Sequence, residues 1–239
     1  KCNQNYESLR ISSASSQFRS DKADEFYKHG FLRRLGLINR CINRVYEIQK
    51  PQSTSLLDKN ELHDLIMSLQ CHTLNVYGAL DNLAWIWVYE KDLRKEDGTE
   101  LDRKQVSLFS PLLRNSFPEE ISKCIDKAKD WFNMVKNFRD ALSHRIPFYV
   151  PPSELNPEEQ KRYRSLEKER DDKIKAGNFE GAVNVFANCR KLGRSSRLMT
   201  HSFNEGAEKI IFHAQIIADW NTLLEIEGKM MKGKGSIFN

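Results

Sequence analysis

Arg139 and His144 are the residues of this chain whose types and spacing best fit a chemical reaction. Arginine carries a permanent positive charge in a planar fork that matches phosphate, and histidine is the side chain that titrates near neutral pH. Together they supply a cation and a proton-transfer group, with which a phosphodiester can be cleaved without a metal ion. Asp140 lies between them and can orient both side chains.

An amphipathic helix must position these residues. Apolar side chains follow a helical period down to the motif, at Ile121, Ile125, Ala128, Phe132, Val135, Phe138 and Leu142. The pattern Ser116-x-x-Glu119 predicts a capping box at the start of this helix. Pro147 ends the helix, because proline has no backbone N–H for the helical hydrogen bond.

Arg139 and His144 converge only if the end of this helix unwinds. Five residues of a regular helix turn through about 500°, which leaves the two side chains about 140° apart. Pro147 restricts Ile146 to extended geometry. We therefore expect the helix to unwind after Ser143, so that His144 turns towards Arg139.

The rest of the chain predicts an all-α fold. Helical periods extend over residues 22–49 and 57–93, a densely charged helix over 156–175, a shorter one over 178–192, and a last helix from Phe203 through Ile210 to Leu224. We expect a bundle of four long core helices in a single domain over residues 21–228, with a charged helical insertion at 156–196. Residues 1–20 are predicted to form a poorly ordered polar arm, and residues 229–239 a frayed tail.

The pattern Arg139-Asp140-x-x-x-His144 resembles the motif of the HEPN superfamily, in which an arginine, usually followed by a polar residue, precedes a histidine near the end of a long helix. The resemblance implies a HEPN-like helical bundle. Many members of that family are metal-independent endoribonucleases of toxin–antitoxin, phage-defence and CRISPR systems, whereas others only bind or scaffold. Members that cut RNA place two motifs across a shared cleft. The resemblance therefore implies a homodimer that acts on RNA, with an antitoxin or a defence-system protein as a further candidate partner.

RNA supplies its own nucleophile, the 2′-hydroxyl, so its cleavage needs a base, an acid for the leaving 5′-oxygen and a cation for the phosphorane. We expect His144 to act as acid or base and Arg139 to stabilise the phosphorane. Asp140 would position both residues. The expected product carries a 2′,3′-cyclic phosphate.

Four further residues are candidates for the site. Asp81 and Asn82 lie in the most apolar helix, where a polar side chain needs a partner. They either contact Arg139 or His144, or form a buried polar pair that fixes the helix register. Arg145 is a second candidate phosphate contact or else a cation at the rim. Some family members carry a tyrosine two residues after the histidine, and here Tyr149 is the nearest one, which makes it a candidate substrate contact.

Composition narrows the functional classes. A net charge of +5 permits an acidic partner but is weak for a dedicated nucleic-acid binder. The five cysteines are scattered without a C-x-x-C pair, and the histidines lack metal-binding spacing, so we predict no zinc site, no metal and no other cofactor. Without a long apolar stretch or a signal peptide, we expect no membrane partner and a cytoplasmic location.

Two other interpretations stay open. The motif can be purely structural, with Arg139 and Asp140 in surface ion pairs and His144 complementing the dipole at the helix C-terminus. The chain would then be a non-catalytic RNA- or protein-binding module or scaffold, whose charged segment 158–175 recruits a partner. A third, weaker hypothesis is that the same cleft binds a nucleotide or the substrate of a nucleotidyl transfer.

Overall fold

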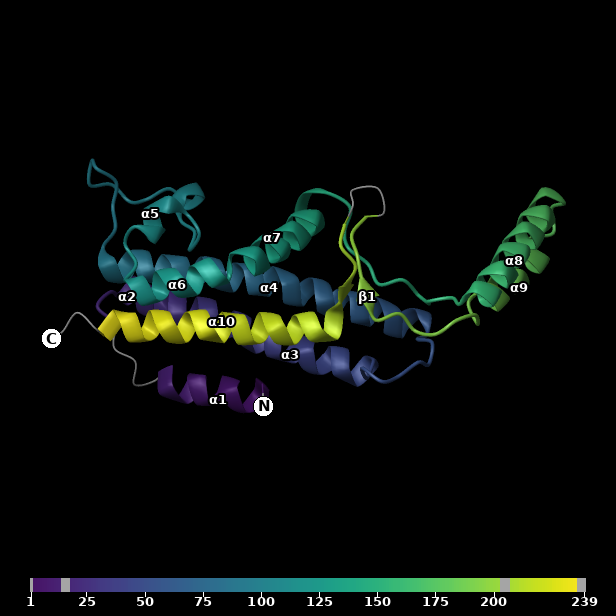
Figure 1. Cartoon of the computed structure of the whole chain (residues 1–239), viewed down its shortest axis with the longest axis horizontal. Coiled ribbons are helices and arrows are strands. Elements are labelled where there is room, and N and C mark those ends of the chain that lie inside the picture. The colour runs from purple at the N-terminus through teal and green to yellow at the C-terminus, as the bar shows by residue number, and fades with distance from the viewer. Residues whose placement is uncertain (1, 14–17, 203–206, 236–239) are drawn as a thin grey trace.

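The computed structural model describes residues 2–13, 18–202 and 207–235, and it confirms the all-α fold. Helix α4 (Lys59–Lys91) is the long central helix, and it lies between α3, α7 and α10 (Figure 1). It begins at a capping box. The Asp58 carboxylate accepts from the backbone N–H groups of Asn60 and Glu61, and the Glu61 carboxylate accepts from the N–H of Asp58.

The first predicted helix consists of three continuous segments. These are α2 (Asp21–Glu25), the π-helical η1 (Phe26–Phe31) and α3 (Leu32–Ile48). Packing between this helix and α4 is close at Gly30, where a Cβ atom would lie 2.7 Å from Nδ2 of Asn82. Glycine therefore lets the two helices approach near the middle of α4.

The third predicted helix is divided into α6 (Glu119–Lys127) and α7 (Lys129–His144). The predicted capping box at Ser116 is wrong, because the N-cap residue is Pro118. The Ser116 hydroxyl instead accepts a hydrogen bond from the indole Nε1 of Trp87 at 2.9 Å. Between α4 and α6, the only helices are the short η2 (Arg103–Gln105) and α5 (Pro111–Arg114).

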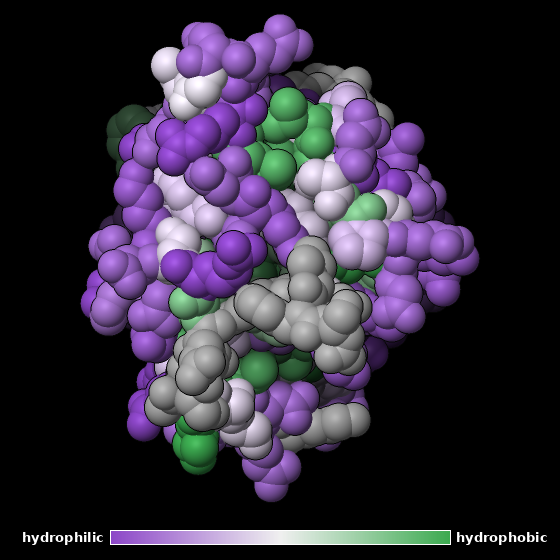
Figure 2. Space-filling view, turned by 90° about the vertical axis from the view of Figure 1, so that its left-hand side faces the viewer, coloured by the Kyte–Doolittle hydropathy of each residue, from purple (hydrophilic) through white to green (hydrophobic). Residues whose placement is uncertain are grey.

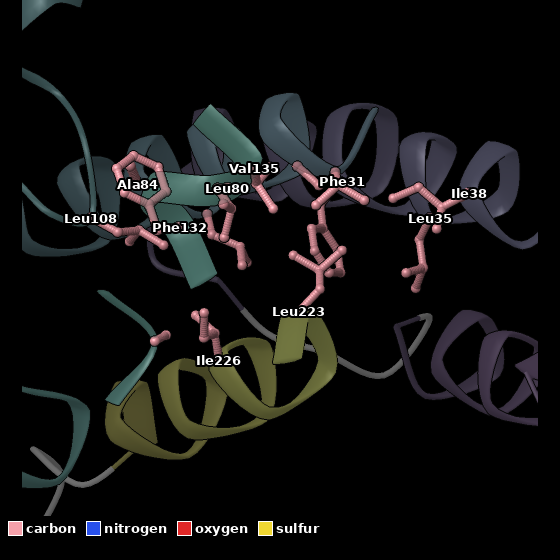
Figure 3. Close-up of a cluster of buried hydrophobic side chains, with 14 of the residues drawn as sticks. Phe31, Leu35, Ile38, Leu80, Ala84, Leu108, Phe132, Val135, Leu223 and Ile226 are labelled. Atoms are coloured by element: carbon pink, nitrogen blue, oxygen red, sulfur yellow. The ribbon is translucent and has the colours of Figure 1, made fainter. Parts of the chain in front are cut away.

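The core lies where these helices meet. Figure 3 shows side chains from η1, α3, α4, α7 and α10 converging on one cluster, which includes Phe31, Leu35, Leu80, Phe132, Val135 and Leu223. All six are at most 9 % exposed. The apolar stripes read from the sequence therefore face one another, and they leave the polar sides of α4 and α7 towards the surface.

Both ends of the chain differ from the predictions. Residues 2–13 form helix α1 (Cys2–Ser13) rather than a loose arm, and Oδ1 of Asn3 accepts a hydrogen bond from Asn39 on α3. Helix α10 (Phe212–Gly235) extends through most of the predicted frayed tail. Its predicted start is wrong, because β2 (Ile210–Ile211) pairs antiparallel with β1 (Leu198–Met199). Residues 203–206, where that helix was expected to begin, lie outside the described residues.

The charged insertion forms a helical hairpin, α8 (Pro157–Lys175) and α9 (Phe179–Cys189). Figure 1 shows this arm projecting beyond the end of the bundle, on two extended segments that pair between Glu154 and Arg194. The opposite end of the molecule is mostly hydrophilic with small hydrophobic patches (Figure 2). Among the described helices, those of the arm extend furthest from the bundle (Figure 1).

Candidate functional site

Arg139 is held at the surface between α7 and α4. Its Nη1 donates to Oδ1 of Asp140 at 2.7 Å, and its guanidinium carbon lies 4.0 Å from the ring centroid of Tyr77. A cation over an aromatic face is attracted by the ring quadrupole. The side chains of Arg139 and Asp140 are 27 % and 28 % exposed, and Lys136 approaches the same carboxylate at 3.4 Å. The arginine is thus fixed in orientation but still reachable from solvent.

His144 does not turn towards Arg139. Helix α7 is regular through His144, so the expected unwinding after Ser143 is wrong. The helix ends because Arg145 leaves helical geometry, with φ −133° and ψ −148°, and its N–H still bonds the carbonyl of Ala141. His144 is exposed, and within one chain its side chain and that of Arg139 diverge around the helix.

Asp81 connects the motif to α3 electrostatically. It lies one helical turn after Tyr77 on α4 and is half-buried. Burial raises the pKa of its carboxyl from 3.8 to about 6, against the opposing attraction of the guanidinium groups of Arg139 and Arg34. Asp81 therefore changes its charge near neutral pH, in the field of both arginines.

Arg34 is a residue of this site that the sequence analysis missed. Its Nε donates to Oδ1 of Asn82 at 3.1 Å, and its Nη1 donates to Oδ1 of Asn75 at 3.2 Å. A Cβ atom on Gly78 would lie 2.5 Å from the guanidinium carbon, so glycine makes room for it. The signal was present, because Asn75, Gly78 and Asn82 share one side of an otherwise apolar helix. Asn82 thus bonds to Arg34, a partner that neither of the two alternatives in the sequence analysis named.

Arg145 and Tyr149 form hydrogen bonds with residues outside the segment from Arg139 to His144. Nη2 of Arg145 donates to the carbonyl oxygen and to Oδ1 of Asn137, at 2.9 Å and 2.6 Å. The amide of Asn137 also lies 3.1 Å from Nε2 of buried His201. Tyr149 pairs through its backbone with Thr200. Both residues therefore help to join the end of α7 to the segment before β2.

A second polar cluster is buried inside the bundle. Oδ2 of Asp219 on α10 lies 3.0 Å from Nε2 of His72 on α4, and its Oδ1 accepts from the indole of Trp131 at 2.8 Å and from Gln215 at 2.6 Å. His72 is 1 % exposed and Asp219 is 4 % exposed. Without access from solvent, this cluster fixes the packing of α10 against α4 and α7.

The described residues contain no group of three or more histidine, cysteine or acidic side chains arranged to hold a metal ion. Within the same part of the chain, every helix is too short or too polar to span a bilayer. Comparison of the chain with protein-family models, with curated proteins and with solved structures gives no match. The family resemblance therefore stands on the segment from Arg139 to His144 alone.

Proposed function

We propose that this chain is a metal-independent endoribonuclease of the HEPN type, which binds RNA on the face formed by α3, α4 and α7. The observation that supports the proposal is the arrangement of charges around Asp81. Arg139 from α7 and Arg34 from α3 both act on this one half-buried carboxyl. Two guanidinium groups from different helices suit the phosphates of a nucleic-acid strand, because each offers a planar fork of donors.

Aromatic side chains extend this face along α4. Trp85 follows Asp81 by one turn, and Tyr89 stacks on Trp85 with ring centroids 5.4 Å apart. Both rings are half-buried and line a hollow of about 510 Å³ together with Phe26. The rest of the lining consists of Leu101, the cation of Arg103 and the carboxylates of Glu100 and Asp102. Aromatic faces next to cations are the usual means of binding single-stranded nucleic acid, since every base can stack on them.

The proposed reaction transfers the phosphoryl group within the RNA strand. The 2′-oxygen attacks phosphorus and loses its proton to a base, while the P–O5′ bond breaks and the 5′-oxygen gains a proton from an acid. Arg139 stabilises the negative charge of the phosphorane. His144 is the proton-transfer residue. Because it diverges from Arg139 within one chain, the proposed active form is a homodimer in which the motifs of two copies face each other.

Cleavage of end-labelled RNA in EDTA tests this proposal. The wild type should release a fragment with a 2′,3′-cyclic phosphate, and His144→Ala and Arg139→Ala should each lower the rate by about 10²-fold or more. His63→Ala is the matched control, because His63 is exposed near the start of α4, about 27 Å along the helix from Asp81. Full activity of His144→Ala, or loss of wild-type activity in EDTA, would contradict the proposal.

The regular end of α7 favours a second candidate function, a non-catalytic RNA- or protein-binding module. Arg139 is held by the carboxylate of Asp140 and the ring of Tyr77, as a structural arginine would be. In that case no variant cleaves RNA, and His144→Ala binds an RNA oligonucleotide as tightly as the wild type. Arg34→Ala should then weaken the binding of the oligonucleotide, because it removes a cation from the face formed by α3, α4 and α7.

A further inference from the structure

Helix α9 of the arm carries an apolar stripe that the described chain leaves largely exposed. Phe179, Val183 and Phe186 follow each other at intervals of four and three residues on α9, which places them on one side of the helix. They are 67 %, 66 % and 45 % exposed. Large apolar side chains exposed in a row are typical of an interaction site rather than of a solvated helix.

The arm itself has little interior. Only Ala182, Val185 and Cys189 of α9 are buried, and α8 contributes no buried residue. Helix α9 packs extensively on α8 alone among the described elements. Two helices with so small a shared core gain stability from a further partner, because packing of an apolar face supplies most of the stability of a helix.

We propose that the stripe of Phe179, Val183 and Phe186 binds the same stripe of a second copy of this chain, with the two α9 helices antiparallel. In a twofold interface residue i of one copy contacts residue j of the other and j contacts i, and only a residue at the axis meets its own counterpart. Val183 lies near the centre of the stripe, so it would lie at the axis. Phe186 of each copy would then pack near Glu180 of the other.

The charges at the two ends of α9 select the antiparallel arrangement. Glu180 lies in the first turn, and Arg190 follows the last residue with its guanidinium carbon 5.2 Å from the centroid of Phe186. Neither side chain forms an ion pair with another residue of the described chain. Antiparallel pairing about Val183 places Glu180 of one copy opposite Phe186 of the other, next to the Arg190 guanidinium that lies on that ring, whereas parallel pairing opposes like charges. The helix dipoles favour the same arrangement.

The size of the stripe predicts a weak dimer. A phenylalanine side chain buries about 200 Å² at most, so the three exposed side chains offer roughly 300 Å² per copy. With the polar residues around them, two copies would bury about 1,000 Å², near the lower end for specific interfaces. The dissociation constant of the dimer should therefore lie in the micromolar range, on the order of 10 µM.

Sedimentation equilibrium of the full chain tests the proposal. Protein concentrations of about 1 to 200 µM bracket the dissociation constant expected for an interface of this size. The wild type should change from monomer to dimer, and Val183→Glu should raise the dissociation constant at least about tenfold, because two like charges meet at the axis. Ser165→Glu adds the same charge on the exposed side of α8 and should leave the dissociation constant unchanged. Far-UV circular dichroism checks that α9 remains helical in each variant.

A charge exchange tests the direction of the helices. Glu180→Arg and Arg190→Glu should each weaken the dimer, and the double variant should restore it. A wild type that remains monomeric throughout, or a dimer that Val183→Glu leaves intact, would overturn the proposal. A double variant that dimerises no more tightly than either single variant would also overturn it. His144→Ala should dimerise like the wild type, because His144 lies at the end of α7 and not on the stripe of α9.

Discussion

Replacing Asp81 by asparagine should remove a pH dependence from the stability of the protein. The carboxyl has a pKa of about 6 in the folded state, against 3.8 in its ordinary environment, because it is half-buried. Between these two pH values the folded state binds more protons than the unfolded state, so the free energy of unfolding falls as pH rises. Asparagine has nearly the same shape and does not titrate, so this loss should disappear.

The size of the effect follows from the change in pKa. One pKa unit corresponds to about 1.4 kcal/mol, so a rise to about 6 corresponds to at most about 3 kcal/mol. The side chain of Asp81 is partly exposed, and solvent screening reduces this to about 1–2 kcal/mol. Asp81→Asn should thus match the wild type near pH 4 and be more stable near pH 7 by about that amount.

Urea denaturation of the wild type and of Asp81→Asn at both pH values measures the effect. The difference in the free energy of unfolding between the two proteins cancels the contributions of groups that titrate in both. Glu227 and His213 also have shifted pKa values, but they are present in both proteins. Asp172→Asn, an exposed change on α8, is the control and should give no such difference. The inference that burial raises the pKa of Asp81 would be refuted by one result. In that result, the free energy of unfolding falls with rising pH no more in the wild type than in Asp81→Asn.

Two other substitutions test the packing. Gly193 has φ +86° and a Cβ there would lie 2.5 Å from the carbonyl oxygen of Glu154, so Gly193→Ala should lower the free energy of unfolding by about 2 kcal/mol or more. Gly98→Ala, at φ +80° in open space, should cost only about 1 kcal/mol, and equal urea midpoints for the two variants would refute this reasoning. Asp219→Ala leaves His72 without its buried partner and should cost about 3 kcal/mol, so a thermal midpoint equal to that of the wild type would show that the cluster does not stabilise the fold.

The helices themselves were determined by local sequence. The predicted helix over residues 57–93 corresponds to α4, and the charged helix over 156–175 corresponds to α8 with Asn156 as its N-cap. Helical periodicity and capping depend on residues three or four apart, so neighbours in sequence carry the necessary information. The orientation of the apolar stripes towards one core follows from the same pattern.

The contacts of the candidate site were decided by tertiary structure. Arg34 and Asn82 lie far apart in sequence, and only the packing of α3 against α4 brings them together. Trp87 and Ser116 are likewise distant in sequence, and the fold places the Trp87 indole where it donates to the Ser116 hydroxyl, while Pro118 is the N-cap residue of α6.

The end of α7 shows the limit of local reasoning most directly. Pro147 restricts the residue before it, but the helix remains regular until His144, because the N–H of Arg145 can still bond to Ala141. Sequence alone identified Arg139 and His144 as a candidate pair. The direction of each side chain depended on groups outside the motif, such as Tyr77, because a long side chain adopts the orientation that its spatial neighbours stabilise.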